Sequence, residues 1–316
     1  MRIAVTLGDP AGIGPEVALA AISALAPDQQ RQLLVFGDEA PLRRAAETLG
    51  VAVPTLALHG QGLGDAAVPG QPDERAGRAS VAYLEDAVAA LRDGRAAGLV
   101  TAPISKTWAR RAGFAFPGHT ELLAERLGAA PVAMMFAGAR LHVALATVHV
   151  PLAEVSARLS AARVRDVTGL LAASLRRDFG VARPRLGVVG LNPHAGEGGL
   201  LGREELEVIA PAIEEARAAH GAACTIEGPL VPDAAFRDAA GGTFDGLVAM
   251  YHDQALIPVK LLDFEDAVNV TLGLPVVRTS PDHGTAYDLA GRGRARARSM
   301  QRALQLAFEM VARRAG

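Results

Sequence analysis

The sequence predicts an α/β fold made of two domains, and two observations support this. Short apolar runs of strand length alternate with longer amphipathic stretches along the chain, which is typical of parallel sheets with right-handed helical crossovers. The chain has 316 residues, more than one hydrophobic core usually organises. Half of the residues are hydrophobic but only 4% are aromatic, so we expect the interior to be packed from Ala, Val, Leu and Ile.

The N-terminal part begins with a strand, a turn and a helix. Residues 3–7 form an apolar run expected to be a buried strand. The sequence GDPAGIGPE (8–16) then turns into a helix, with Pro15 suited to its first position. The segment 51–79 contains Gly, Pro and Gln and is expected to be a long irregular segment without helix or strand. The other strands expected in this part are 33–36 and 98–101.

The rest of the chain repeats the alternation. A helix is expected over 152–179, with a break near Ser160. The other expected helices are 204–220 and 299–313, with a short one over 254–259. The expected strands are 132–136, 142–148, 186–189 and 247–250.

Composition excludes several classes of protein. A formal net charge of −2 and a pI near 6.5 give no electrostatic reason to expect nucleic-acid binding. The single cysteine, Cys224, excludes an internal disulfide and suits a reducing compartment. The sequence shows no signal-peptide pattern and no apolar run long enough to cross a membrane. We therefore expect a cytoplasmic protein with no membrane partner.

Three histidines share one sequence context. His149, His194 and His252 each follow an apolar run predicted to be a strand. In a parallel sheet the carboxyl ends of the strands lie at one edge, so these imidazoles can converge. Three neutral imidazoles with open remaining positions suit a catalytic divalent metal such as zinc, cobalt or nickel. For any one of them alone, the simpler interpretation is a hydrogen-bonded histidine at a strand end.

Charged residues near these histidines suggest an anionic substrate. Asp253 is placed to orient an imidazole through a hydrogen bond. Lys260 lies two helical turns beyond His252. Lys260 and Arg278 sit among apolar neighbours and together favour a phosphate, although two solvated surface cations are the alternative.

His119 and Thr120 open a further predicted helix, whose amide groups can receive the same anion. A simple helix cap at Thr120 is the competing interpretation. Lys106, one of only two lysines in the chain, is either part of the site or an ordinary exposed lysine.

Eight sequence segments follow one another along nearly the whole chain: GDPAGIGPE (8–16), TAPISK (101–106), PGHTE (117–121), ATVHVPL (146–152), GLNPHAGEGG (190–199), AMYHDQALIPVK (249–260), VNVTLGLP (268–275) and RTSPDHGTAYDLAGRG (278–293). Together they resemble the 4-hydroxythreonine-4-phosphate dehydrogenase family of the pyridoxal phosphate (vitamin B6) pathway. That family is similar to isopropylmalate and isocitrate dehydrogenases. The resemblance implies two α/β/α domains with a cleft between them, comprising 1–125 plus 276–316 on the cofactor side and 126–275 on the metal side. It also implies a homodimer with shared active sites.

The resemblance also assigns residues by motif. It implies metal ligation by His149, His194 and His252, and substrate binding by His119, Thr120, Lys260, Asn269 and Arg278. DHGTAYDLAG resembles the loop that holds the adenosine end of the coenzyme, which implies cofactor binding by Asp282, His283, Gly284, Thr285 and Ala286. The catalytic candidates are Lys260, Asp253 and Asp233, and the general base stays open among Asp233, Asp253, Lys106 and bulk water.

The implied reaction is the NAD- or NADP-dependent oxidation of 4-phosphooxy-L-threonine, with one divalent metal (zinc, cobalt or magnesium) per subunit. The β-keto acid product would decarboxylate to 3-amino-2-oxopropyl phosphate. Two alternatives stay open: a dehydrogenase of another four-carbon phosphorylated acid, such as phospho-threonate or phospho-erythronate, and a three-histidine metal lyase or aldolase. An arginine cluster at 294–298 leaves the choice between NAD and NADP open, because it is either a solvated helix entry or a site for the NADP phosphate.

Overall fold

The computed structural model describes residues 1–316 and divides into two compact units. The first unit comprises Met1–Ala130 and Leu274–Ala315, and the second comprises Pro131–Gly273. Both units have helices packed on a sheet, so the predicted α/β class is confirmed. None of the helices has the length and apolar character needed to cross a membrane.

The sheet of the first unit is entirely parallel, with strand order β3-β2-β1-β4-β11. Ile3 pairs with Leu33 on one side and with Gly98 on the other. The central strands are buried along their whole length because helices cover both faces, which explains their continuous apolar sequences. The strands are β1 (Ile3–Thr6), β2 (Leu33–Phe36), β3 (Ala57–His59), β4 (Gly98–Thr101) and β11 (Val277–Pro281).

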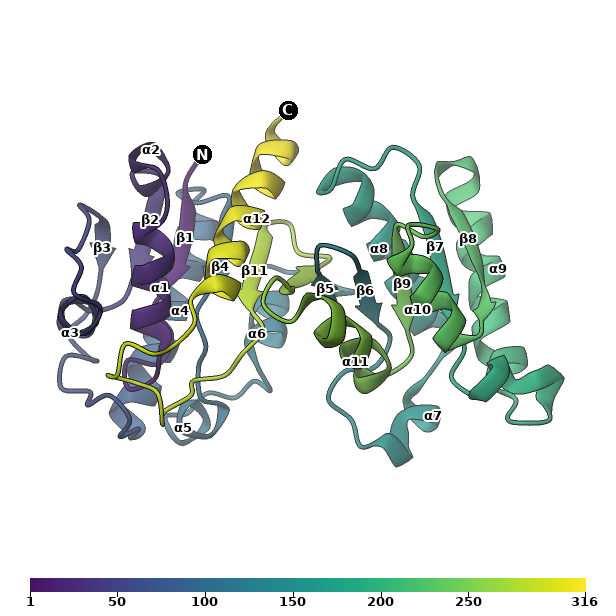
Figure 1. The fold of residues 1–316 in the computed structure, drawn as a ribbon, viewed down its shortest axis with the longest axis horizontal. Helices are drawn as coiled ribbons and strands as arrows, with labels where there is room; N and C mark the ends of the chain where they lie inside the picture. The colour runs from purple at the N-terminus through teal and green to yellow at the C-terminus, as the bar shows by residue number, and fades with distance from the viewer. The chain divides into compact units, whose positions relative to one another are not determined.

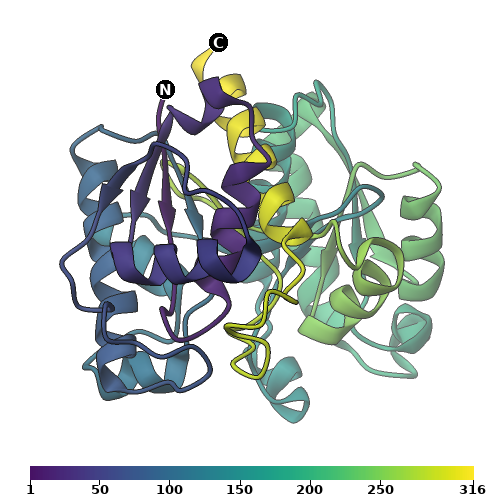
Figure 2. The same cartoon turned by 60° about the vertical axis from the view of Figure 1, so that its left-hand side comes forward.

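Two sets of helices cover this sheet. The helices α1, α3 and α12 pack together on one face, and α4 with α5 packs on the other (Figure 1 and Figure 2). Both termini lie at the same end of this unit. The helices are α1 (Gly14–Ser23), α2 (Pro27–Gln30), α3 (Glu39–Leu49), α4 (Glu74–Arg92), α5 (Lys106–Arg111), α6 (His119–Arg126) and α12 (Arg298–Ala315).

The sheet of the second unit is mixed, with strand order β10-β5-β6-β9-β7-β8. The four strands β6, β9, β7 and β8 are parallel, whereas β10, β5 and β6 pair antiparallel. The strands are β5 (Ala133–Ala137), β6 (His142–Leu145), β7 (Arg185–Val189), β8 (Thr225–Leu230), β9 (Gly246–Ala249) and β10 (Val268–Leu272).

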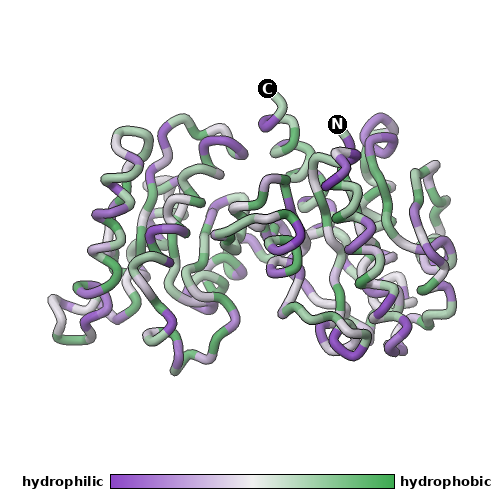
Figure 3. Tube along the Cα trace, turned by 180° about the vertical axis from the view of Figure 1, so that it is seen from behind, coloured by the Kyte–Doolittle hydropathy of each residue, from purple (hydrophilic) through white to green (hydrophobic).

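In the second unit, α8 with α9 packs on one side of the sheet, while α10 and α11 contact the strands separately. Figure 3 shows the strands of both units as mainly hydrophobic stretches and the outer helical turns as mixed. The helical segments are η1 (Leu152–Glu154), α7 (Val155–Arg158), α8 (Ala161–Arg177), η2 (Pro193–Gly199), η3 (Glu205–Ile209), α9 (Ala210–His220), η4 (Gly221–Ala223), α10 (Pro232–Ala240) and α11 (His252–Asp263).

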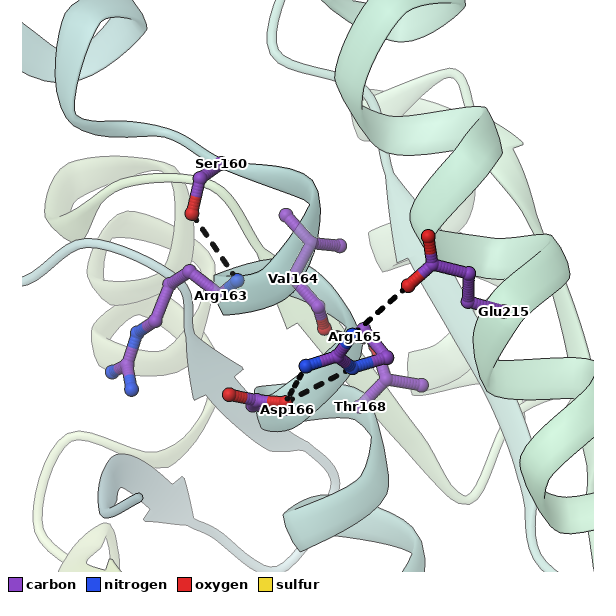
Figure 4. A network of polar contacts seen from close by, with 7 residues as sticks. All are labelled: Ser160, Arg163, Val164, Arg165, Asp166, Thr168 and Glu215. Carbon is purple, nitrogen blue, oxygen red and sulfur yellow. Dashed lines mark hydrogen bonds and ion pairs between the residues drawn. The ribbon is translucent and has the colours of Figure 1, made fainter. Parts of the chain in front are cut away.

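The start of α8 confirms the predicted break near Ser160. The Ser160 hydroxyl caps the helix by accepting a hydrogen bond from the backbone N–H of Arg163 (3.3 Å), as Figure 4 shows. Arg165 then links α8 to α9, because its guanidinium bonds both Asp166 (2.8 Å) and Glu215 (3.0 Å).

Three predicted segments differ from the structure, and one is the short helix expected over 254–259, which extends over His252–Asp263 as α11. The segment 51–79 is not irregular throughout, because it contains β3 and the start of α4. The side chain of Asp73 caps α4 by accepting from the backbone N–H of Ala76 (2.8 Å). The helix predicted over 204–220 is present, but its first turn, η3, has the wider π-helical form.

Candidate functional site

The three strands that precede the candidate metal ligands are neighbours. The strands β6, β9 and β7 lie next to one another and are parallel. Their carboxyl ends therefore lie at one edge of the second unit's sheet. His149, His252 and His194 follow these strands in that order.

Two of the three imidazoles lie close together. The ring centroids of His149 and His252 are 5.7 Å apart, with the rings tilted by 41°. The Nδ1 atom of His252 lies 2.7 Å from Oδ1 of Asp253. When Nδ1 carries the proton, Asp253 accepts it in a hydrogen bond and Nε2 presents its lone pair, which is the usual arrangement of a metal-ligating histidine.

The third histidine lies on an exposed turn with unusual backbone geometry. Five successive residues from His194 to Gly198 have positive φ, between 43° and 77°. Three of them are not glycine, and the left-handed region costs such residues about 1–2 kcal/mol each. No group of three or more His, Cys, Asp or Glu side chains in the structure is arranged to hold a metal ion. The structure thus brings together two of the three predicted ligands, and ligation by all three stays a prediction.

The carboxylate of Glu205 holds the turn that carries His194. Its side chain is buried, with an exposed fraction of 3%. Oε1 accepts from the backbone N–H groups of Leu191 and Asn192, both at 2.7 Å, and Oε2 accepts from Nδ2 of Asn192 at 2.9 Å. Gly196 has a φ of 77°, and a Cβ there would lie 2.6 Å from Oε2 and 3.1 Å from the carbonyl oxygen of Gly202, so a side chain at this position would be strained. A strained turn of this kind persists when the hydrogen bonds around it hold the backbone in one conformation.

The remaining candidates of the second unit occupy separate elements. Asp233 is exposed in the first turn of α10. Lys260 lies on α11, with Nζ 5.1 Å from the ring centroid of Phe264. Asn269 lies on β10, and its Oδ1 atom is buried without a hydrogen-bond partner.

The first unit gathers the other substrate candidates around a buried guanidinium. Arg278 on β11 has an exposed fraction of 4%, and its Nη2 donates to Oγ1 of Thr101 (2.8 Å). Burial lowers the pKa of Arg278 to about 10. His119 begins α6, and its Nε2 atom is buried without a hydrogen-bond partner. The interpretation of Thr120 as the helix cap was wrong, because Gly118 occupies the cap position.

Two cations, Arg278 and Lys106, lie near His119. Burial, Arg278 and Lys106 together lower the pKa of His119 to about 3, so its imidazole is neutral at pH 7. The acid Glu121 also lies near Arg278, so two cations and one acid leave the formal charge of this cluster net positive. The cluster can therefore attract an anion such as phosphate.

Acidification is expected to destabilise the protein through His119. In the unfolded chain this imidazole binds a proton near its ordinary pKa of 6.5, but in the folded chain only near 3. As the pH falls from 6.5 towards 3, the unfolded state binds more protons, and the free energy of unfolding falls by up to about 1.4 kcal/mol per pH unit. Urea titrations at pH 7.0 and 5.5 measure this effect. Between these pH values the free energy of unfolding should fall less in His119→Gln than in the wild type. Equal losses would contradict this origin.

The predicted cofactor residues lie between β11 and α12, outside helices and strands. The backbone N–H of Asp282 donates to Oγ of Ser299 (3.1 Å), and Nδ1 of His283 lies 3.2 Å from the carbonyl oxygen of Gly284. The carbonyl oxygen of Thr285 accepts from the backbone N–H of Ile13 (2.9 Å), and Ala286 has a positive φ of 40°.

Comparison with known proteins places this chain in a family. Residues 28–307 match the family described as "Pyridoxal phosphate biosynthetic protein PdxA". The chain belongs to the PdxA family. It is 45% identical over 326 residues to the 4-hydroxythreonine-4-phosphate dehydrogenase of Desulfosudis oleivorans, covering 98% of this chain and 96% of the relative. The predicted family and the predicted class of enzyme, an oxidoreductase, are confirmed.

Solved structures agree with this placement in the PdxA family. The crystal structure of 4-hydroxythreonine-4-phosphate dehydrogenase from Klebsiella pneumoniae matches with a TM-score of 0.87 and 37% identity, covering 98% of this chain and 99% of that chain. An isocitrate dehydrogenase from Methylococcus capsulatus shares the fold, with a TM-score of 0.50 and 16% identity over 100% of this chain and 87% of that chain. The predicted relation to the isocitrate dehydrogenase fold is thereby confirmed.

Proposed function

We propose that this protein oxidises 4-phosphooxy-L-threonine with NAD or NADP to a β-keto acid, which decarboxylates to 3-amino-2-oxopropyl phosphate, in pyridoxal 5'-phosphate biosynthesis. The observation that carries the proposal is the buried Arg278 guanidinium, with the neutral His119 ring and the exposed Lys106 beside it, in a chain of the PdxA family. This cluster offers positive charge and N–H donors to the phosphate group of a substrate.

Arg278 and His119 are proposed to bind the phosphate group. The guanidinium presents a planar set of N–H donors that suits phosphate oxygens. The neutral His119 ring adds a polar atom that has no partner within the protein. Thr120, Lys260 and Asn269 are the further substrate contacts that the family resemblance implies.

A divalent metal, either zinc, cobalt or magnesium, is proposed to bind at His149, His252 and His194. The close approach of the His149 and His252 rings fits two ligands of one ion. When bound, the ion supplies positive charge that lowers the pKa of a substrate hydroxyl and withdraws electrons from a carbonyl group. Asp253 orients His252. Lys260, Asp253 and Asp233 are the proposed catalytic side chains, and the proton acceptor stays open among Asp233, Asp253, Lys106 and water.

The coenzyme is proposed to bind at residues 282–286, and the protein is proposed to act as a cytoplasmic homodimer with shared active sites. Three exposed apolar side chains support the dimer: Ile257 and Leu261 on α11 and Phe264 directly after its last residue, with exposed fractions of 68%, 82% and 66%. An exposed apolar stripe of this kind is typical of a protein–protein contact.

Substrate profiling tests the proposal. The purified protein is supplied with zinc, cobalt or magnesium and with NAD or NADP, and reduced nicotinamide is followed by its fluorescence. We expect turnover with 4-phosphooxy-L-threonine, and a decrease in kcat on the order of 10³-fold or more in His252→Ala. His220→Ala, at the end of α9 in the same unit, is the control and should retain activity.

Other results would identify the alternatives. Turnover only with phospho-threonate or phospho-erythronate would indicate the related dehydrogenase. Metal-dependent cleavage without nicotinamide reduction would indicate a lyase or aldolase. Undiminished activity in His252→Ala would refute the metal assignment.

A further inference from the structure

Two buried carboxylates from the start of the chain hold the 282–293 loop. The first is Asp9, which is fully buried, with an exposed fraction of 0%. Its Oδ1 atom accepts from the backbone N–H of Ala11 (2.9 Å). Its Oδ2 atom accepts from the hydroxyl of Tyr287 (2.7 Å), which belongs to the loop. Asp9 therefore ties the centre of the loop to the turn after β1.

The second carboxylate is Glu16, with an exposed fraction of 5%. Its Oε1 accepts from the backbone N–H of Gly291 (2.5 Å) and its Oε2 from that of Gly293 (3.1 Å). Both oxygens thus bind backbone groups at the end of the loop. A buried carboxylate with these bonds is stabilised only while the loop keeps this shape, because losing them would leave the charge unpaired.

The backbone of the first turn also fits the loop closely. The N–H of Ile13 donates to the carbonyl oxygen of Thr285 (2.9 Å). A Cβ on Gly12 would lie 2.9 Å from the same oxygen, so glycine is required at this approach. The loop is therefore held at its start, centre and end by residues 9–16.

We propose that Asp9 and Glu16 are positioning residues that hold the 282–293 loop in the shape that binds the coenzyme. This inference rests on the proposed function, which assigns residues 282–286 to coenzyme binding. A loop without helix or strand must otherwise be ordered when the ligand binds, and that ordering weakens affinity. Loosening the loop should therefore weaken coenzyme binding with little effect on the chemical step.

The first unit contains a second tyrosine–aspartate pair that serves as a matched control. The hydroxyl of Tyr83 donates to Oδ2 of Asp38 (2.6 Å), and Asp38 also accepts from the backbone N–H groups of Gly62 and Gly64. Both tyrosines donate to a buried aspartate, and in both pairs burial and the carboxylate raise the tyrosine pKa. Asp38 holds the 62–64 segment rather than the coenzyme loop.

The test compares Tyr287→Phe with Tyr83→Phe in the full-length protein. Each change removes one hydroxyl and keeps the ring. We expect Tyr287→Phe to raise the Kd of NAD or NADP, measured by titration calorimetry, by about fivefold to tenfold. Its kcat at saturating coenzyme and its KM for the phosphorylated substrate should stay within about twofold of the wild type. Tyr83→Phe should lower the thermal midpoint but leave the coenzyme Kd unchanged.

Glu16→Gln provides a second variant of nearly unchanged shape. Its amide keeps one oxygen acceptor and turns an NH₂ donor towards a backbone N–H, so one tether is lost. We again expect weaker coenzyme binding at unchanged kcat.

The outcomes separate this inference from the proposed function. If the wild type binds a coenzyme and Tyr287→Phe binds it equally well, the positioning role is overturned while the function stands. The positioning role is also overturned if both tyrosine variants weaken coenzyme binding equally, because the effect then comes from a general loss of stability. If the wild type binds neither NAD nor NADP, both are overturned.

Discussion

Replacing Arg278 with methionine is expected to lower kcat/KM for the phosphorylated substrate by a factor on the order of 10² to 10³. The guanidinium is the buried cation of the proposed phosphate site, and an apolar side chain cannot bind an anion. The fold should survive the change. Burial lowers the pKa of Arg278, which means that its surroundings disfavour the charge. A methionine of similar length should therefore leave the free energy of unfolding unchanged or raise it. Steady-state kinetics together with urea unfolding measure both effects.

Arg163→Met is the matched control for this experiment. Arg163 is also a partly buried arginine, but it donates to two backbone carbonyl oxygens, those of Ala146 and Val132, both at 2.8 Å. Its loss leaves those carbonyls unpaired and should lower the free energy of unfolding by about 1–3 kcal/mol. Its KM for the substrate should change by less than about threefold. Equal effects of the two variants on kcat/KM would contradict the phosphate role of Arg278.

Replacing Glu205 with alanine is expected to lower the free energy of unfolding by about 2–6 kcal/mol. The change leaves the N–H groups of Leu191 and Asn192 without their buried acceptor, and each such group costs about 1–3 kcal/mol. It also releases the left-handed turn that carries His194. Urea unfolding measures the loss of stability, and hydrogen exchange should show faster opening of residues 190–200.

Glu204→Gln tests whether this effect belongs to the buried carboxylate. Glu204 is the neighbouring acid and is more exposed than Glu205. It accepts from Oγ of Ser156 (2.6 Å) and from Nδ2 of Asn192 (2.7 Å). Because its bonds are near solvent, we expect a loss below about 1 kcal/mol. A loss as large as that of Glu205→Ala would show that charge in this region matters more than the buried bonds.

The sequence predicts those parts of the fold that depend on local pattern. The strand at Ile3–Thr6 is predictable because it is buried on both faces and therefore continuously apolar. The strand at Ala57–His59 is short and largely exposed, so no apolar pattern marks it. The start of α4 carried a usable signal, since Asp73 is a favoured capping residue directly before the helix.

The same distinction holds for the site. The approach of His149 and His252 follows from the parallel strands that precede them. The left-handed turn at His194 does not follow from its own sequence, because a carboxylate eleven residues later holds it. Asp9 and Tyr287 are 278 positions apart, and no local pattern can reveal such a pair.

The first unit is built from two separate segments of the chain, so its sheet cannot be completed until the second segment has been synthesised. Val277 on β11 pairs beside Gly98 on β4, so this part of the sheet must wait until β11 has left the ribosome. Pro131–Gly273 is one continuous stretch that contains all the strands of its own sheet, β5 to β10. The middle of the gene product can therefore fold while the beginning still lacks a strand, and a nascent chain stalled near its end would expose that gap to chaperones.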